Sequence, residues 1–197
     1  MIILTFYIMD ETYANFAEPI EGVNIFAKES CDVCEGILRV KQHPLRIYFQ
    51  GKRMADFYSI PQYTFISDKM QRVLLENNIT GFSLEPFILQ EEAIPFMKLP
   101  LDHVKTLKEL AVHGDGGYIC HSNGEQIKKC HHCGRILENK RTIEGLSVNT
   151  KEWDGSDIFF FKNWFGVIIV TEKVKEIIEK HKFKNVRFID LAEFRFA

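Results

Sequence analysis

Four of the five cysteines in this 197-residue chain form two CxxC pairs, the pattern with the clearest chemistry in the sequence. The paired residues are Cys31, Cys34, Cys130 and Cys133. Two intervening residues let one tight turn direct both thiolates at a single ion, and two facing turns complete the tetrahedral four-cysteine shell that zinc prefers. The spacing therefore predicts one structural zinc ion. Because four thiolates fill the shell, no position remains for water or substrate, and we expect no catalysis at the metal.

The two pairs lie far apart in the chain. The 95 residues from 35 to 129 separate them, whereas zinc ribbons usually have a far shorter gap. By the loop-closure estimate, a cross-link that closes a loop of about 100 residues contributes roughly 4–5 kcal/mol, against a typical domain stability of ~5–15 kcal/mol. We therefore expect the metal to stabilise the fold.

Redox activity is the main alternative for the cysteine pairs. A reactive CxxC motif needs a lowered thiol pKa, which a helix N-terminus or a nearby positive charge can provide. The first pair is instead surrounded by Glu29, Asp32 and Glu35, which would raise the pKa of its thiols. The fifth cysteine, Cys120, has no CxxC partner, and we expect it to be a small buried hydrophobic residue.

Basic and histidine side chains gather near the second cysteine pair. The basic ones are Lys128, Lys129, Arg135, Lys140 and Arg141. They would neutralise the formal −2 charge of a zinc site with four thiolate ligands, and the alternative is a phosphate-binding patch. The histidines nearby are His113, His121, His131 and His132. Since the chain has no HExxH or comparable arrangement, we expect these to be ordinary surface or core residues.

The turn sequence that begins at Trp153 is a second candidate site. Asp-Gly-Ser at 154–156 is a turn signal, and it precedes the apolar run at 158–161. One interpretation is a structural turn anchored by a buried tryptophan. The other is a partner-binding corner formed by Trp153, Asp154 and Asp157.

Two segments of the chain share a strand–helix–strand pattern at a constant offset of 104 residues. In each, a short apolar strand leads to Ser67 or Thr171, residue types that cap a helix by accepting a bond from a first-turn N–H. Apolar positions spaced i, i+3 and i+4 follow, so we predict amphipathic helices that begin near these residues. Gly81 and Asn185, at matching positions, tolerate the left-handed conformation that ends helices.

The correspondence extends upstream of the helices. Ala55-Asp56-Phe57 and Ser156-Asp157-Ile158 match after a gap of three residues. We therefore predict pseudo-repeats at about 55–89 and 156–191, separated by a less regular mixture of strand and turn patterns. This combination predicts an α+β fold.

No low-complexity linker divides the chain, so residues 1–197 are expected to form a single compact unit. In this fold the two strand–helix–strand units bracket a split, zinc-ribbon-like site of four cysteines, with knuckles at 31–34 and 130–133. Hydrophobic residues make up 46% of the chain and charged residues 26%, which is typical of a globular protein with a real core.

Charge and hydropathy argue against several classes of function. A net charge of −2 lacks the strong positive field that nucleic-acid binding needs. No stretch reaches the ~18 apolar residues of a membrane span, and residues 1–9 lack the features of a signal peptide and are expected to form a first strand. We therefore expect a cytoplasmic protein that does not act at a membrane and whose main partner is not nucleic acid.

The motifs taken together resemble a known family. Two CxxC knuckles flank a long middle, the second continues into Gly134, and residues 157–172 read DIFFFKNWFGVIIVTE. This combination resembles the double-CxxCG motif family of bacterial proteins, which includes immunity proteins against swarming-inhibition, contact-dependent toxins. The likeness extends from the first CxxC to nearly the C-terminus. The first knuckle departs from the motif: Glu35 follows its second cysteine and Gly36 stands one place late, which puts the local turn geometry in question.

The resemblance implies that the four paired cysteines are metal ligands and that the protein is not an enzyme. It implies toxin immunity, in which the chain binds a cognate bacterial toxin in the cytoplasm and blocks it by occlusion, with no small-molecule substrate. No toxin-contacting residue carries over from the motif. The alternative function is a zinc-ribbon nucleic-acid-binding regulator, favoured by the basic residues near the second pair, and an enzyme is the third possibility.

Overall fold

A computed structural model describes residues 4–12, 18–21, 26–41, 45–60 and 63–196, and it confirms the α+β fold class. The strands are β1 (Phe6–Asp10), β2 (Glu18–Glu21), β3 (Phe26–Ser30), β4 (Ile37–Lys41), β5 (Arg46–Gln50), β6 (Phe57–Ile60), β7 (Tyr63–Ile66), β8 (Phe82–Glu85), β9 (Ile88–Leu89), β10 (Lys108–Val112), β11 (Gly114–Asp115), β12 (Cys120–His121), β13 (Leu146–Ser147), β14 (Ile158–Phe161), β15 (Trp164–Thr171) and β16 (Arg187–Asp190). The α-helices are α1 (Asp68–Glu76), α2 (Leu101–Thr106) and α3 (Glu172–His181), and the 3-10 helices are η1 (Glu91–Phe96), η2 (Lys140–Thr142) and η3 (Leu191–Glu193).

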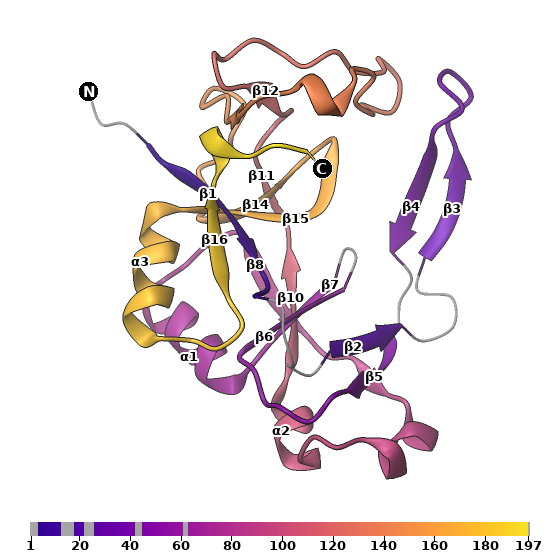
Figure 1. Cartoon of the computed structure of the whole chain (residues 1–197), viewed down its shortest axis with the longest axis vertical. Helices are drawn as coiled ribbons and strands as arrows, with labels where there is room; N and C mark the ends of the chain where they lie inside the picture. Colours follow the sequence, from indigo (N-terminus) through magenta and orange to yellow (C-terminus); the bar gives the residue numbers. More distant parts are fainter. Residues whose placement is uncertain (1–3, 13–17, 22–25, 42–44, 61–62, 197) are drawn as a thin grey trace.

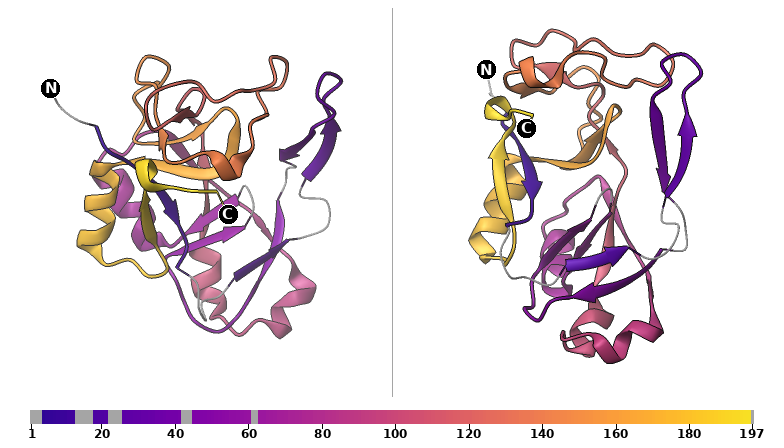
Figure 2. Two further views of the ribbon diagram at one scale, coloured as in Figure 1. Left: turned by 45° about the horizontal axis from the view of Figure 1, so that its top comes forward. Right: turned by 45° about the vertical axis from the view of Figure 1, so that its right-hand side comes forward.

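Two sheets organise the molecule (Figure 1). The larger has the strand order β11-β14-β15-β1-β16, and the other has the order β6-β7-β10-β8. Helices α1 and α3 lie side by side and share one hydrophobic core with both sheets (Figure 2). A second core packs α2 and β5 on the smaller sheet, and a third packs the segment from 119 to 146 on the larger one. The strand expected within residues 1–9 is observed as β1, and residues 1–3 lie outside the described part.

The two predicted helices are confirmed, each within a strand–helix–strand unit: β7–α1–β8 and β15–α3–β16. Ser67 caps α1 as expected, because its Oγ accepts a hydrogen bond from the backbone N–H of Met70 at 3.3 Å. Thr171 is the N-cap residue of α3, but the expected cap bond from its side chain is wrong. Its hydroxyl instead donates to Asp157 Oδ1 at 3.2 Å, because the packing of the two units places that carboxylate at the start of the helix. The limits of the pseudo-repeats and the single unit 1–197 stay predictions.

Two aspartates link the units reciprocally. Asp56 Oδ1 accepts from the N-cap hydroxyl of α1 at 2.7 Å, and its Oδ2 accepts from the backbone N–H of Lys184, beyond α3, at 2.7 Å. Asp157 Oδ1 accepts from the N-cap hydroxyl of α3, and its Oδ2 accepts from the backbone N–H of Thr80, beyond α1, at 3.1 Å. Thr80 and Lys184 are separated by the same offset of 104 residues that relates the helices. Asp56 therefore connects the N-terminus of α1 to the backbone that follows α3. Asp157 in turn connects the N-terminus of α3 to the backbone that follows α1.

Replacing Asp157 tests this link. Its carboxylate also accepts from the Thr80 hydroxyl and pairs with Lys173 Nζ at 3.1 Å, and its side chain is only 14% exposed. We expect Asp157→Asn to lower the free energy of unfolding by about 1–3 kcal/mol, because several donors lose a charged acceptor. Urea denaturation measures the change, and Glu176→Gln on the exposed face of α3 is the matched control. Equal midpoints for the two variants would contradict the expectation.

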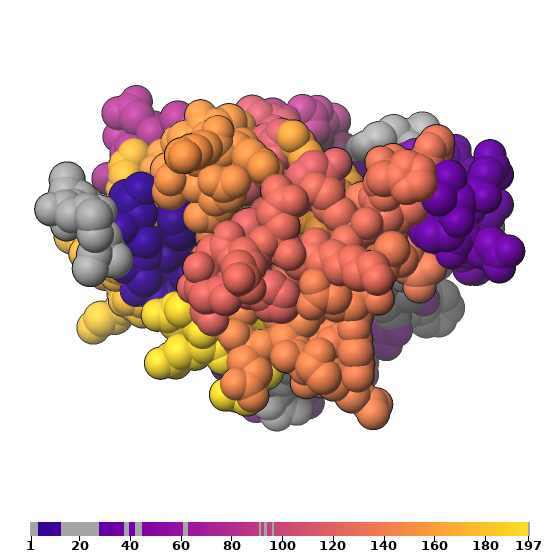
Figure 3. Space-filling model, turned by 90° about the horizontal axis from the view of Figure 1, so that it is seen from above, coloured from indigo at the N-terminus to yellow at the C-terminus, as the bar shows by residue number. Residues whose placement is uncertain are grey.

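Strands β3 and β4 form a hairpin that stands apart from the two main sheets (Figures 1 and 2). Among the described strands they pair only with each other. The first knuckle, residues 31–34, forms the turn at the tip of this hairpin. Seen from above, the hairpin touches the segment that carries the second knuckle (Figure 3). The fold thus brings together two turns that are distant in the sequence.

Candidate metal centre

The two CxxC knuckles have the same backbone geometry. In the first, the N–H of Cys31 donates to the carbonyl of Gly36 at 2.9 Å, and the N–H of Glu35 donates to the carbonyl of Cys31 at 2.8 Å. The second knuckle repeats both bonds at the matching positions, at 2.8 and 2.9 Å. The displaced glycine of the first knuckle therefore leaves the turn unchanged.

The residue after the second cysteine of each knuckle adopts a left-handed conformation. Gly134 has a φ of 76° in the second knuckle, and Glu35 has a φ of 54° at the matching position in the first. A residue with a Cβ pays a conformational cost there that glycine does not. The first knuckle thus keeps the turn of the motif, with strain at Glu35.

Relieving that strain should tighten metal binding. We expect Glu35→Gly to raise the metal affinity about 2- to 5-fold, the equivalent of roughly 0.5–1 kcal/mol. Competition with a chelating dye measures the affinity. Glu29→Gly removes the same charge from extended strand β3, where glycine relieves no strain, so this control should bind no tighter than the unmodified protein. Identical affinities for the two variants would contradict the expectation.

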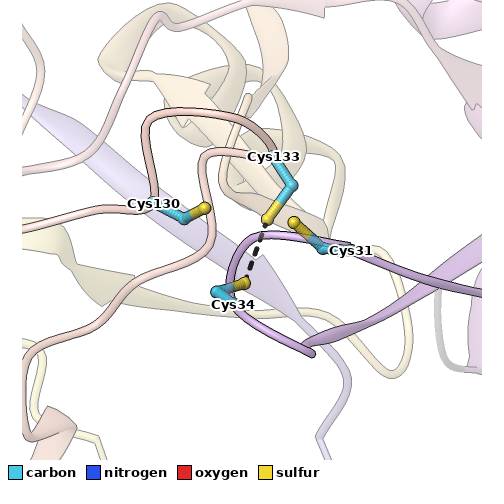
Figure 4. Close-up of side chains that lie close together, drawn as sticks. All are labelled: Cys31, Cys34, Cys130 and Cys133. Atoms are coloured by element: carbon cyan, nitrogen blue, oxygen red, sulfur yellow. Dashed lines mark hydrogen bonds between the residues drawn. The ribbon is translucent and has the colours of Figure 1, made fainter.

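All four predicted ligands converge at one point (Figure 4). Their Sγ atoms lie within 4.8 Å of one another, and those of Cys34 and Cys133 are 3.6 Å apart. Cys31 and Cys130 are buried, and the other two are partly exposed. Two turns at the ends of different segments therefore form a four-sulfur cluster that could hold a metal ion.

Backbone N–H groups favour the thiolate form of the first cysteine in each knuckle. The N–H groups three and two residues later lower the pKa of Cys31, and the equivalent groups lower the pKa of Cys130 to about 6. For Cys133 the backbone N–H of Arg135 lowers the pKa, but burial and the neighbouring thiols outweigh it and raise the pKa to about 12. Clustered thiolates repel one another, so one thiol keeps its proton until a cation compensates the charge.

Arg135 and Gly36 bring the two knuckles into direct contact. Gly36 is buried, and a Cβ placed on it would lie 2.5 Å from Nη1 and 2.6 Å from Cδ of Arg135. The arginine side chain of the second knuckle therefore lies directly over the backbone of the first, and its positive charge is close to the hairpin tip. The glycine one place late was the only sequence signal for this close approach.

Other basic side chains near the second knuckle contact aromatic rings. The Nζ atoms of Lys129 and Lys140 lie 3.4 and 5.3 Å from the ring centroids of Tyr118 and Phe196. Such cation–π contacts keep these two ammonium groups close to the protein surface. Lys128 and Arg141 are exposed. Neutralisation of a bound metal and phosphate binding both stay predictions for this group.

The remaining cysteine and the histidines lie outside the four-sulfur cluster. Cys120 is 1% exposed, which confirms that it is a small buried residue, and burial raises the pKa of its thiol. His131 and His132 are exposed on the second knuckle, as is His113 elsewhere. His121 pairs with Glu138, with Nε2 and Oε2 3.1 Å apart. None of these residues joins the cluster in the described part of the chain.

The turn that begins at Trp153 makes internal contacts. The indole ring packs edge-on against Phe6, at a centroid distance of 5.2 Å, and its Nε1–H donates to the carbonyl of Ser156 at 3.1 Å. Asp154 accepts from the N–H groups of Asp115 and Ser156, both at 2.9 Å. With Asp157 linking the two units, all three residues have a structural role. A partner-binding role for them stays a prediction.

The chain can also be compared with known proteins. No family model and no curated protein matches it. In the part of the chain that the structure describes, no helix is both long enough and apolar enough to cross a membrane. The candidate metal centre is therefore the feature on which a functional proposal depends.

Proposed function

We propose that this protein is a non-enzymatic immunity protein that binds a cognate bacterial toxin in the cytoplasm and blocks it by occlusion. The observation that carries the proposal is the four-sulfur cluster, in which two matching knuckles meet across 95 residues of chain. Paired knuckles with a long middle are the feature that resembles the double-CxxCG motif family. The likeness of residues 157–172 to the same family supports the proposal in combination with the cysteine pairs, since neither feature would be specific enough alone.

The metal in this proposal is zinc, held by Cys31, Cys34, Cys130 and Cys133. Four sulfurs at the zinc–sulfur distance of about 2.3 Å form a tetrahedron with edges of roughly 3.8 Å. The Sγ atoms of Cys34 and Cys133 are 3.6 Å apart, and all four lie within 4.8 Å, so small side-chain shifts suffice. Thiolate-only tetrahedral sites select zinc or iron among the common metals, and zinc needs no redox partner.

A structural role for the zinc suits a binding protein. Four thiolates leave the ion no position for a substrate, so the metal's contribution is to hold the two knuckles in a fixed arrangement. A surface that is already ordered loses less entropy when a partner binds, which favours tight association. The proposal therefore assigns recognition to the protein surface, and the metal keeps part of that surface ordered.

A nucleic-acid-binding regulator is the second candidate. Lys128, Arg135, Lys140 and Arg141 are all exposed within one short segment that includes the second knuckle. Binding through such residues would weaken steeply as salt rises, because phosphate contacts release counterions. Binding to a protein toxin would not need to weaken steeply as the salt concentration rises.

Co-expression tests the immunity proposal directly. The C-terminal domain of a candidate toxin, chosen from genes that neighbour the gene of this protein, is produced in a sensitive host, with and without this protein. The expected result is survival only when this protein is present, together with a stable complex of the two purified proteins. In parallel, binding of the purified protein to DNA and RNA over a range of salt concentrations tests the regulator.

A further inference from the structure

The β3–β4 hairpin, residues 26–41, contributes no described side chain to the three hydrophobic cores of the protein. Its strands pair only with each other among the described strands. A two-stranded hairpin with no further partner is marginally stable in water. Its order therefore depends on the contacts that its described residues make with the body, which here means the two main sheets with α1, α3 and the segment 119–146.

At the tip of the hairpin, those contacts come from the four-sulfur cluster and its surroundings. Cys34 approaches Cys133 at 3.6 Å between Sγ atoms, and the side chain of Arg135 lies over Gly36. Thiols gain little from meeting one another without a cation, whereas a bound cation would make two bonds to each knuckle. A bound metal would therefore strengthen the tip contact beyond what the packing of Arg135 on Gly36 provides.

At the base of the hairpin, a charged pair provides an attachment that needs no metal. Lys41 Nζ lies 3.1 Å from Oε1 of Glu109 and 4.5 Å from the ring centroid of Tyr63. Glu109 is 1% exposed, and its Oε2 has no hydrogen-bond partner in the described structure. A buried carboxylate with so few partners needs the lysine, since separation would leave an uncompensated buried charge.

The second knuckle has its own support in the body. Ile127 and Ile136 lie on either side of it, and both belong to the third core together with Phe159 and Ile169 of the larger sheet. No described side chain of the hairpin takes part in this packing. Loss of a metal would therefore leave the second knuckle in place while removing the metal–sulfur bonds that join it to the hairpin tip.

We propose that the metal site is a latch for the hairpin. A bound cation fastens the tip of β3–β4 to the second knuckle, and loss of the cation releases the hairpin about its Lys41–Glu109 base while the body stays folded. This inference rests on the proposed zinc site. In this proposal residues 26–41 are ordered only when metal is bound. The concentration of available metal therefore controls whether the hairpin surface has a fixed structure.

Hydrogen exchange of the full chain tests the latch, with the zinc-loaded protein compared with the same protein after chelation under reducing conditions. We expect the amides of 26–41 to exchange at least about 10-fold faster after chelation, and those of α1 and β15 to change less than about 2-fold. Equal protection of the hairpin in both forms overturns the latch, as does a loss of protection throughout the chain. Metal analysis of the loaded sample separates the two proposals. A sample without metal overturns the zinc site together with the latch, whereas bound metal with an unchanged hairpin overturns the latch alone.

A locked variant provides the complementary test. Cys31→Ser combined with Cys130→Ser leaves one cysteine in each knuckle, and diamide accepts the two electrons and two protons released as Cys34 and Cys133 form a disulfide. The oxidised variant is expected to keep 26–41 protected without metal and in the presence of chelator, and the reduced variant is expected to lose that protection. Fast exchange of the hairpin despite a formed disulfide overturns the proposal, because fastening the tip would then not order the hairpin.

Discussion

Cys133→Ser is expected to abolish stoichiometric zinc binding and to lower the melting temperature by roughly 8–20 °C. The unmodified protein should contain about one zinc per chain when it is prepared without added metal. Removing one ligand opens the tetrahedral site and loses the closure of a loop of about 100 residues, worth roughly 4–5 kcal/mol. For a chain of this length, each kcal/mol shifts the melting temperature by about 2–4 °C. Emission spectroscopy measures the metal, and circular dichroism measures the melting curve.

Cys120→Ser is the matched control for this experiment. Cys120 is as buried as the first cysteine of either knuckle, and it lies outside the cluster. The control should keep one zinc per chain. Its free energy of unfolding should fall by less than that of Cys133→Ser, because the only change is a hydroxyl in place of a buried thiol. Two results would count against the zinc site: a fully folded wild-type protein without metal, and metal-free and metal-loaded forms that melt at the same temperature.

Protection against a single cognate toxin is the second large effect that we expect. We expect a host that produces the toxin domain to survive with this protein and to die without it. The purified pair should associate well below micromolar concentration, which corresponds to more than about 8 kcal/mol of binding free energy. Narrow specificity should follow, because cognate pairs depend on a few desolvated anchors and mismatched charges oppose other partners. Survival counts and titration calorimetry measure the two effects.

A toxin from an unrelated gene pair is the control for specificity, and this protein should not protect against it. Equal death with and without the protein, together with no association at micromolar concentration, would show that immunity is wrong for the toxin tested. Salt-sensitive binding to DNA or RNA would then favour the regulator. Asp154→Asn is a poor probe of a toxin interface, because the Asp154 carboxylate also accepts hydrogen bonds from the backbone N–H groups of Asp115 and Ser156.

Short-range patterns in the sequence identified the cysteines of the candidate metal centre and the two helices. The CxxC spacing identifies Cys31, Cys34, Cys130 and Cys133 because a turn that presents two thiolates is built from consecutive residues. Ser67 and Thr171 mark the starts of α1 and α3, and the apolar spacing after them identifies the faces that are buried in the first core. Such signals work because capping, helix periodicity and turn formation act over only a few residues.

The hydrogen bonds that the polar groups of these helices and turns make depend on the tertiary packing. The Thr171 hydroxyl donates to Asp157, and Asp157 also binds the exit of the other helix, because the packing of the two units brings together residues 77 apart. Glu35 takes a left-handed conformation that its residue type disfavours, since the hydrogen bonds of the knuckle require it there. The described side chains of the hairpin that carries the first knuckle stand outside every core, and its cysteines and Lys41 attach it to the body. These features depend on which strands pair and which faces of the elements pack together. The hydrophobic pattern of one segment does not show which distant segment it contacts, so the sequence alone does not predict these contacts.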